Sequence, residues 1–79
     1  MQYGRPMVTI QLDNRGLQPP EPMVRILAAL GELGDGDEVV ALMDREPMLL
    51  YPELERRGLT WEFGGSEDGY VLTVRRETS

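Results

Sequence analysis

The chain has 79 residues, of which 41% are hydrophobic, and it carries a formal net charge of −6. This length predicts a single domain spanning residues 1–79, near the lower limit at which a core is stable without cross-links. The negative charge argues against nucleic-acid binding. No apolar run approaches the roughly 20 residues of a membrane span, and residues 1–10 lack the apolar centre of a signal peptide. We therefore expect a cytoplasmic protein that has no membrane partner.

Several reactive residue types are missing from the chain. It contains no Cys, no His and no Lys, so all eight cationic residues are Arg. These absences exclude a thiolate nucleophile, an imidazole base, a Schiff-base amine and a soft metal ligand. Side-chain acid/base chemistry would therefore have to come from Asp, Glu or Tyr, and we expect no catalytic residues, no cofactor and no metal site. The same composition is typical of a GC-rich genome or of a thermophile, and the sequence leaves both explanations open.

The first predicted element is a strand at residues 7–12. Here the apolar Val8, Ile10 and Leu12 alternate with polar residues, which is typical of a half-buried strand. The DNRG segment that follows predicts a turn with positive φ at Asn14 and Gly16.

A helix is predicted next, beginning at Pro20 and continuing to Leu33, because hydrophobic residues recur there at helical spacing. Gly34 is a suitable C-cap. The first N–H groups of a helix have no intrahelical partner, so the prolines of the PPEP segment are tolerated at its start. They also remove donors that would bind an anion, and we expect no anion site there. Glu21 is well placed at the positive end of the helix dipole.

The rest of the chain alternates between strand and helix patterns. Turn residues, apolar alternation and Pro52 divide it into segments. In order, these are a polar turn at 34–38, a nearly continuous apolar strand at 39–43, a helical region at 48–58 whose helix starts near Pro52, and strands at 59–63 and 70–75 joined by a hairpin loop at 64–69.

This order predicts an α+β two-layer sandwich, β-α-β-α-β-β, in which a mixed four-stranded sheet carries two helices on one face. The opposite face of the sheet is expected to contact water through Thr9, Gln11, Thr60, Glu62 and Thr73. The core that the periodicity predicts includes Val8, Ile10, Leu12, Ile26, Leu27, Leu30, Val40, Leu42, Leu54, Trp61 and Leu72.

A candidate site follows from the ends of the first two strands. Sites in sheets with parallel crossovers lie beyond the carboxyl ends of the strands, and here those ends are followed by acidic and Arg residues. Two interpretations remain open: a docking or ligand patch, or helix caps and salt bridges without further function. The predicted patch consists of Asp13, Arg15, Glu21, Asp44, Arg45 and Glu46.

The segment 12–22, LDNRGLQPPEP, resembles the opening of the TusA/SirA-like sulfur carriers, whose pattern is Leu-Asp-x-x-Gly-Leu-x-Cys-Pro-x-Pro before the first helix. The GDGDEV turn and the Asp after the second strand also agree. The Cys position of the carriers falls on Pro19, which offers no nucleophile. The chain therefore resembles an uncharacterised, domain-of-unknown-function branch of this superfamily, in which PPEP replaces CPxP. The matching residues are Leu12, Asp13, Gly16, Leu17, Pro20 and Pro22.

The resemblance implies a sulfur-carrier fold without the carrier thiol. We therefore predict a non-catalytic protein-interaction module with a protein partner, itself a monomer or a weak homodimer. Relatives in this branch occur beside hemerythrin-like, cupin or nitrogen-oxide-related proteins, so the resemblance also implies a redox, metal or nitrogen-oxide-related pathway. The alternative is a small ligand-binding protein or enzyme that uses the carboxylate/Arg patch. RNA binding, which the similar fold of a translation initiation factor domain suggests, is disfavoured by the net charge.

Overall fold

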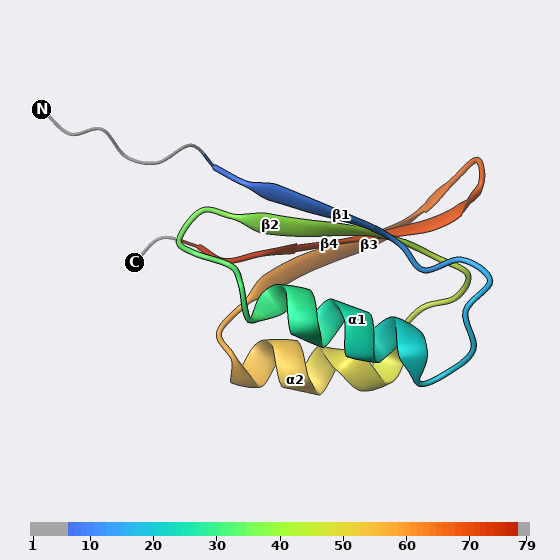
Figure 1. Cartoon of the computed structure of the whole chain (residues 1–79), viewed down its shortest axis with the longest axis horizontal. Helices are drawn as coiled ribbons and strands as arrows, with labels where there is room; N and C mark the ends of the chain where they lie inside the picture. The colour runs from blue at the N-terminus through green and yellow to red at the C-terminus, as the bar shows by residue number, and fades with distance from the viewer. Residues whose placement is uncertain (1–6, 78–79) are drawn as a thin grey trace, which may run out of the picture.

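The structure, a computed structural model, describes residues 7–77, so residues 1–6 and 78–79 of the predicted domain lie outside the described range. Its sheet has the order β1-β2-β4-β3; β1 is parallel to β2, and β4 is antiparallel to both of its neighbours. Figure 1 shows both helices on one face of this sheet. The predicted α+β sandwich is therefore confirmed. The elements are β1 (Thr9–Asp13), α1 (Glu21–Leu30), β2 (Glu38–Met43), the 3-10 turn η1 (Met48–Leu50), α2 (Tyr51–Arg56), β3 (Thr60–Ser66) and β4 (Gly69–Arg75).

The end of α1 differs from the prediction. The helix stops at Leu30 with Gly31 as its C-cap, so the predicted C-cap at Gly34 is wrong. A buried carboxylate explains the difference, because Asp37 is only 2% exposed and its Oδ2 accepts the N–H of Gly34 at 2.8 Å. Its Oδ1 accepts the N–H of Val8 at 2.9 Å. Asp37 thus holds the segment between α1 and β2 through two hydrogen bonds, in a region that the helical spacing and Gly34 had predicted to be the last turn of the helix.

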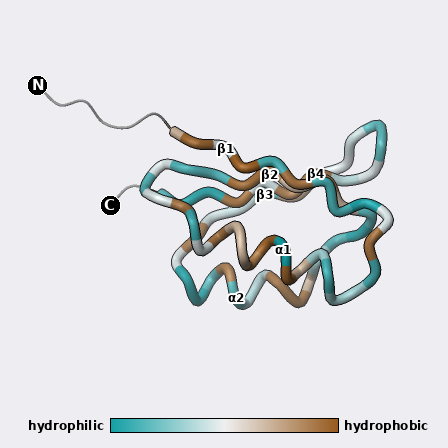
Figure 2. Tube along the Cα trace, viewed as in Figure 1, coloured by the Kyte–Doolittle hydropathy of each residue, from teal (hydrophilic) through white to brown (hydrophobic). Residues whose placement is uncertain are grey.

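The core lies between the sheet and the helices, and most of its predicted members are confirmed. Ile10, Leu12, Leu27 and Trp61 pack half-buried against it. In Figure 2 hydrophobic and hydrophilic segments alternate along the strands, α1 is mainly hydrophobic, and the hairpin tip and the α1–β2 turn are mainly hydrophilic. The buried hydrophobic residues are Ile26, Ala29, Leu30, Leu33, Val39, Ala41, Met43, Leu50, Leu54, Leu59, Leu72 and Val74.

Three predicted core residues are wrong. Val8 precedes β1 and is 42% exposed, while Val40 and Leu42 lie on the sheet face away from the helices. The inward residues of β2 are instead Val39, Ala41 and Met43. Because β2 is apolar throughout, its own sequence does not show which face is buried. The face is decided by pairing with β1, which sets Val39 opposite the inward-facing Ile10.

The open face of the sheet carries the predicted polar residues but is apolar at its centre. Val40 pairs with Gln11 on one side and Thr73 on the other. Two residues further along β2, on the same face, Leu42 pairs with Asp13 and Val71. This face therefore combines a polar surround with a small apolar strip on β2 and β4.

The β3–β4 hairpin is longer than predicted. Its ladder continues to the pair Ser66 and Gly69, which leaves Glu67 and Asp68 as the turn in place of the predicted loop 64–69. Figure 1 shows the hairpin tip at the same end of the molecule as the β1–α1 loop. The tip therefore brings acidic side chains to the end of the sheet where the candidate site lies.

Candidate functional site

A cavity of about 350 Å³ opens where β1 and β2 end and where α1 and η1 begin. Its position beyond the carboxyl ends of the parallel strands is the one expected for this topology. Pockets that hold small ligands are typically about 300–1,000 Å³ and mainly apolar. We call this space the proline cavity, because its walls include Pro19, Pro20, Pro22 and Pro47 together with Leu17, Met23 and Met43.

The start of α1 forms one wall of the proline cavity. Pro20 is the N-cap, Pro22 lies in the first turn as predicted, and the Pro19–Pro20 peptide bond is cis. Glu21 donates its N–H to the carbonyl of Gln18 at 3.0 Å. Since proline has no N–H, these residues contribute carbonyl groups and apolar rings to the wall but no backbone donors. The start of α1 therefore offers few donors to an anion.

Asn14 is the least exposed polar residue described, with 1% of its surface accessible, and it lines the proline cavity. Its backbone N–H donates to the carbonyl of Leu42 at 2.9 Å, and its Nδ2 donates to the carbonyl of Pro22 at 3.2 Å. The sulfur of Met43 lies 3.7 Å from the same Nδ2. The Oδ1 atom has no hydrogen-bond partner among the described residues. Asn14 thus presents one unpaired, buried acceptor.

The predicted turn conformation of Asn14 is wrong, because Gly residues alone have positive φ in residues 7–77. Gly16, with a φ of 80°, has the conformation that the sequence predicted. The alternation of β1 contains the signal that finds Asn14: Ile10 and Leu12 face inward, and Asn14 is the next residue in that series. Its burial follows from the continuation of the strand pattern by one step.

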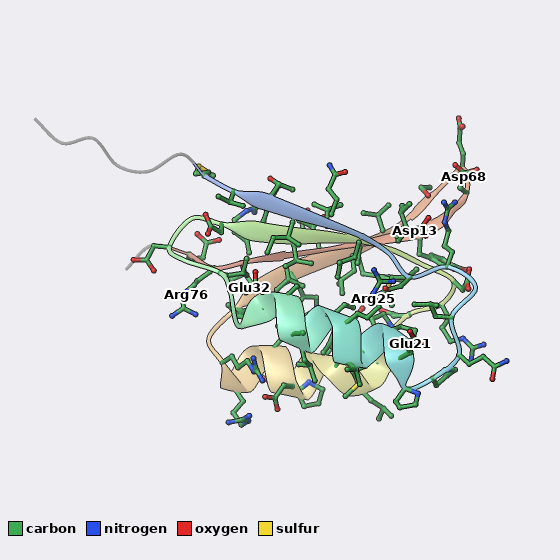
Figure 3. All side chains as sticks on the ribbon, viewed as in Figure 1. Asp13, Glu21, Arg25, Glu32, Asp68 and Arg76 are labelled. Carbon is green, nitrogen blue, oxygen red and sulfur yellow. The ribbon has the colours of Figure 1, made fainter. Side chains whose placement is uncertain are left out.

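The predicted patch is divided by the structure. Arg15 pairs with Asp13 through two hydrogen bonds of 2.9 Å, and neither residue lines the proline cavity. The hydrogen bonds from Arg15 lower the pKa of Asp13 to about 2. Glu21 is exposed on α1 and also lies outside the cavity. Figure 3 shows Asp13, Glu21 and Asp68 at one end of the molecule and Glu32 and Arg76 at the other.

The other half of the patch lies on the proline cavity, where Asp44, Arg45 and Glu46 contribute to its lining. Oδ2 of Asp44 accepts the N–H of Gly16 at 2.6 Å. Oε2 of Glu46 accepts the hydroxyl of Tyr51 at 2.9 Å; burial, together with this bond, raises the pKa of Tyr51 to about 12. Arg45 makes no ion pair or hydrogen bond with residues 7–77. Arg45, which is unpaired among the described residues, is therefore flanked in the sequence by two carboxylates that each accept one hydrogen bond, Asp44 and Glu46.

Two features are absent from residues 7–77. Within 7–77 there is no group of three or more His, Cys, Asp or Glu residues arranged to hold a metal ion. No helix in the same range is long and apolar enough to cross a membrane.

The element order, the proline-led first helix and the cavity beside it define a small SirA-like α+β domain. The crystal structure of a SirA-like protein from Desulfitobacterium hafniense is 30% identical in sequence, covers 91% of this chain and 100% of its own, and superposes with a TM-score of 0.69. Residues 11–76 match the family described as "Uncharacterized conserved protein (DUF2249)", and the chain belongs to this family. A comparison with curated proteins finds no match.

Proposed function

We propose that this domain is a non-catalytic protein-interaction module of the cytoplasm whose partner docks over the proline cavity. The observation that carries the proposal is the apolar mouth of this cavity, where Met48 is 62% and Leu49 is 83% exposed. Contiguous exposed apolar surface is typical of interaction sites. The charged residues 44–46 border the same opening and supply the polar rim that surrounds such contacts.

The absence of a thiol supports a docking function over sulfur transfer. The whole chain contains no Cys, and the residue that occupies the Cys position of the carriers is Pro19, which lines the proline cavity. A partner that docks on this surface meets a proline ring where the carriers present sulfur. In this proposal the family branch retained a docking surface and lost the carrier thiol, and the partner belongs to the redox, metal or nitrogen-oxide-related pathway that the resemblance implies.

The geometry gives less support to the alternative of a ligand site or an enzyme that uses the whole carboxylate/Arg patch. Asp13 and Arg15 bond to one another and lie outside the cavity, and the side chain of Glu21 bonds to neither of them and also lies outside the cavity. A site that needs these three residues together with residues 44–46 is therefore not assembled in one cavity.

The test is retention of a native partner on a column that carries the immobilised chain. Leu49→Asp should abolish retention, because it places a charge in the apolar mouth. Val24→Asp is the matched control, since Val24 is 57% exposed on α1 and does not line the cavity. Both substitutions are at exposed positions and should change the free energy of unfolding by less than about 0.5 kcal/mol. Wild-type retention by Leu49→Asp would refute the proposed docking surface.

A further inference from the structure

The hydrogen-bonding groups of the proline cavity indicate what kind of side chain fits it. A buried acceptor without a partner destabilises the folded state, and Oδ1 of Asn14 is such an acceptor. A ligand that donates a hydrogen bond to this atom would remove that cost. Nδ2 of the same side chain already donates to the carbonyl of Pro22, which fixes the orientation of the amide with Oδ1 as the free atom.

The mouth of the proline cavity adds further acceptors. Each carboxylate there has used one oxygen internally, Asp44 for the N–H of Gly16 and Glu46 for the hydroxyl of Tyr51. Their second oxygens make no hydrogen bond to residues 7–77. The four prolines of the wall contribute no N–H. Arg45 is the one cation of the lining, and the two carboxylates outnumber it.

We propose that the docking partner anchors itself by a lysine side chain inserted into the proline cavity, with its ammonium donating to Oδ1 of Asn14 and facing the carboxylate of Asp44. This inference rests on the proposed function and names the partner's anchor. The apolar stem of lysine suits a wall of proline, leucine and methionine side chains, and its ammonium has donors but no acceptor. The net charge of the whole chain, −6, also favours association with a cationic group.

Lysine fits this cavity better than arginine. A single buried acceptor matches the compact ammonium, whereas the planar guanidinium is suited to two-pronged contact with a carboxylate. The chain contains no Lys at all, so a second copy of this chain cannot provide the anchor. The anchor therefore comes from a different chain.

The first experiment uses analogues of the side chain on the intact protein. n-Butylammonium, butan-1-ol and pentanoate are titrated while the Asn14 side-chain amide and the methyl groups of Met23 and Met43 are followed by NMR. Butylammonium should bind most tightly and shift all three signals, with binding weakened by added salt. Tighter binding of pentanoate, or the absence of shifts at Asn14 and Met43, would overturn the inference.

Charge-removing variants locate the ammonium. Asp44→Asn keeps an oxygen to accept the N–H of Gly16 but removes the charge, and it should weaken butylammonium binding by about two- to five-fold. Glu21→Gln is the matched control, because it removes an equal charge outside the cavity and should leave binding unchanged. An equal loss in the two variants would contradict binding at the cavity mouth.

The second experiment separates this inference from the proposed function. The partner extract is acetylated, which neutralises lysine, or reductively methylated, which keeps its charge, before it passes over the immobilised chain. This chain has no Lys, so the lysine chemistry concerns the partner alone. Acetylation should abolish retention and methylation should preserve it. Retention after acetylation would refute the lysine anchor while leaving the docking surface intact. Failure of the docking surface itself is detected by Leu49→Asp, and butylammonium binding still decides whether the cavity accepts an ammonium.

Discussion

Replacing Asn14 by Leu should leave the domain as stable as the wild type or make it more stable. The substitution removes the bond from Nδ2 to the carbonyl of Pro22, which is worth about 0.5–1.5 kcal/mol. It also removes the unpaired Oδ1, whose burial costs about 1–3 kcal/mol. Residue 14 does not have a positive φ, so its backbone conformation accepts a leucine. The balance therefore lies between a loss of about 0.5 kcal/mol and a gain of about 2.5 kcal/mol, so that most of the range is added stability.

The assay is urea denaturation followed by the fluorescence of Trp61, the single Trp of the chain. Leu54→Ala calibrates the opposite outcome, because Leu54 is 0% exposed and its truncation should lower the free energy of unfolding by about 2–5 kcal/mol. In a domain of this size, 1 kcal/mol corresponds to about 4–8 °C in melting temperature. The two variants should therefore differ clearly in thermal as well as in chemical denaturation.

A loss of stability in Asn14→Leu as large as that in Leu54→Ala would refute the reasoning. Such a loss would mean that the Asn14 amide holds the fold together and that its Oδ1 is satisfied in solution. The lysine anchor would then lose its main support. The expected result for Asn14→Leu is retained stability together with lost butylammonium binding. This result would show that the Asn14 acceptor serves recognition at a cost to the stability of the fold.

Three further predictions follow from the sheet, the exposed ion pair and the cavity wall. Val39→Ala should lower the free energy of unfolding by about 1–3 kcal/mol and Val40→Thr by much less, because only Val39 belongs to the buried core. Urea denaturation measures both, and equal losses would contradict the assignment of Val39 to the buried face of β2. The pKa of Asp13 should be about 2 by NMR titration and should rise towards 3.8 in Arg15→Ala. Because the folded-state pKa is depressed, the pair stabilises the fold above about pH 4 and loses that contribution as the pH falls towards 2. The wild-type chain should carry no persulfide after incubation with a cysteine desulfurase and cysteine, because it has no thiol. Pro19→Cys places a thiol in the cavity wall, and mass spectrometry distinguishes the two proteins. A persulfide on the wild type would refute the loss of carrier chemistry.

The element order and the start of α1 were predictable because their signals are local. Alternation in β1, helical spacing after Pro20 and turn residues before β2 each act within a few residues of the chain. The ends of the first two strands also placed the predicted patch at the edge of the sheet where the proline cavity lies, since the carboxyl ends of parallel neighbours share an edge. The end of α1 was not predictable in this way, because the buried Asp37 accepts the N–H of Gly34 and also that of Val8, which is 29 residues away in the chain.

The sequence by itself therefore determined which elements form, in what order, and at which edge the polar residues gather. Only the tertiary structure decided three features of the molecule. Strand β2 buries Val39 and leaves Val40 half-buried on the opposite face of the sheet, Asp13 pairs with Arg15, and Asn14 lines a cavity with one oxygen that has no hydrogen-bond partner among the described residues. The physical reason is the pairing of β1 with β2. Strand side chains alternate with a period of two, so a one-residue change in register reverses every face, and a continuously apolar strand carries no local pattern to prevent it.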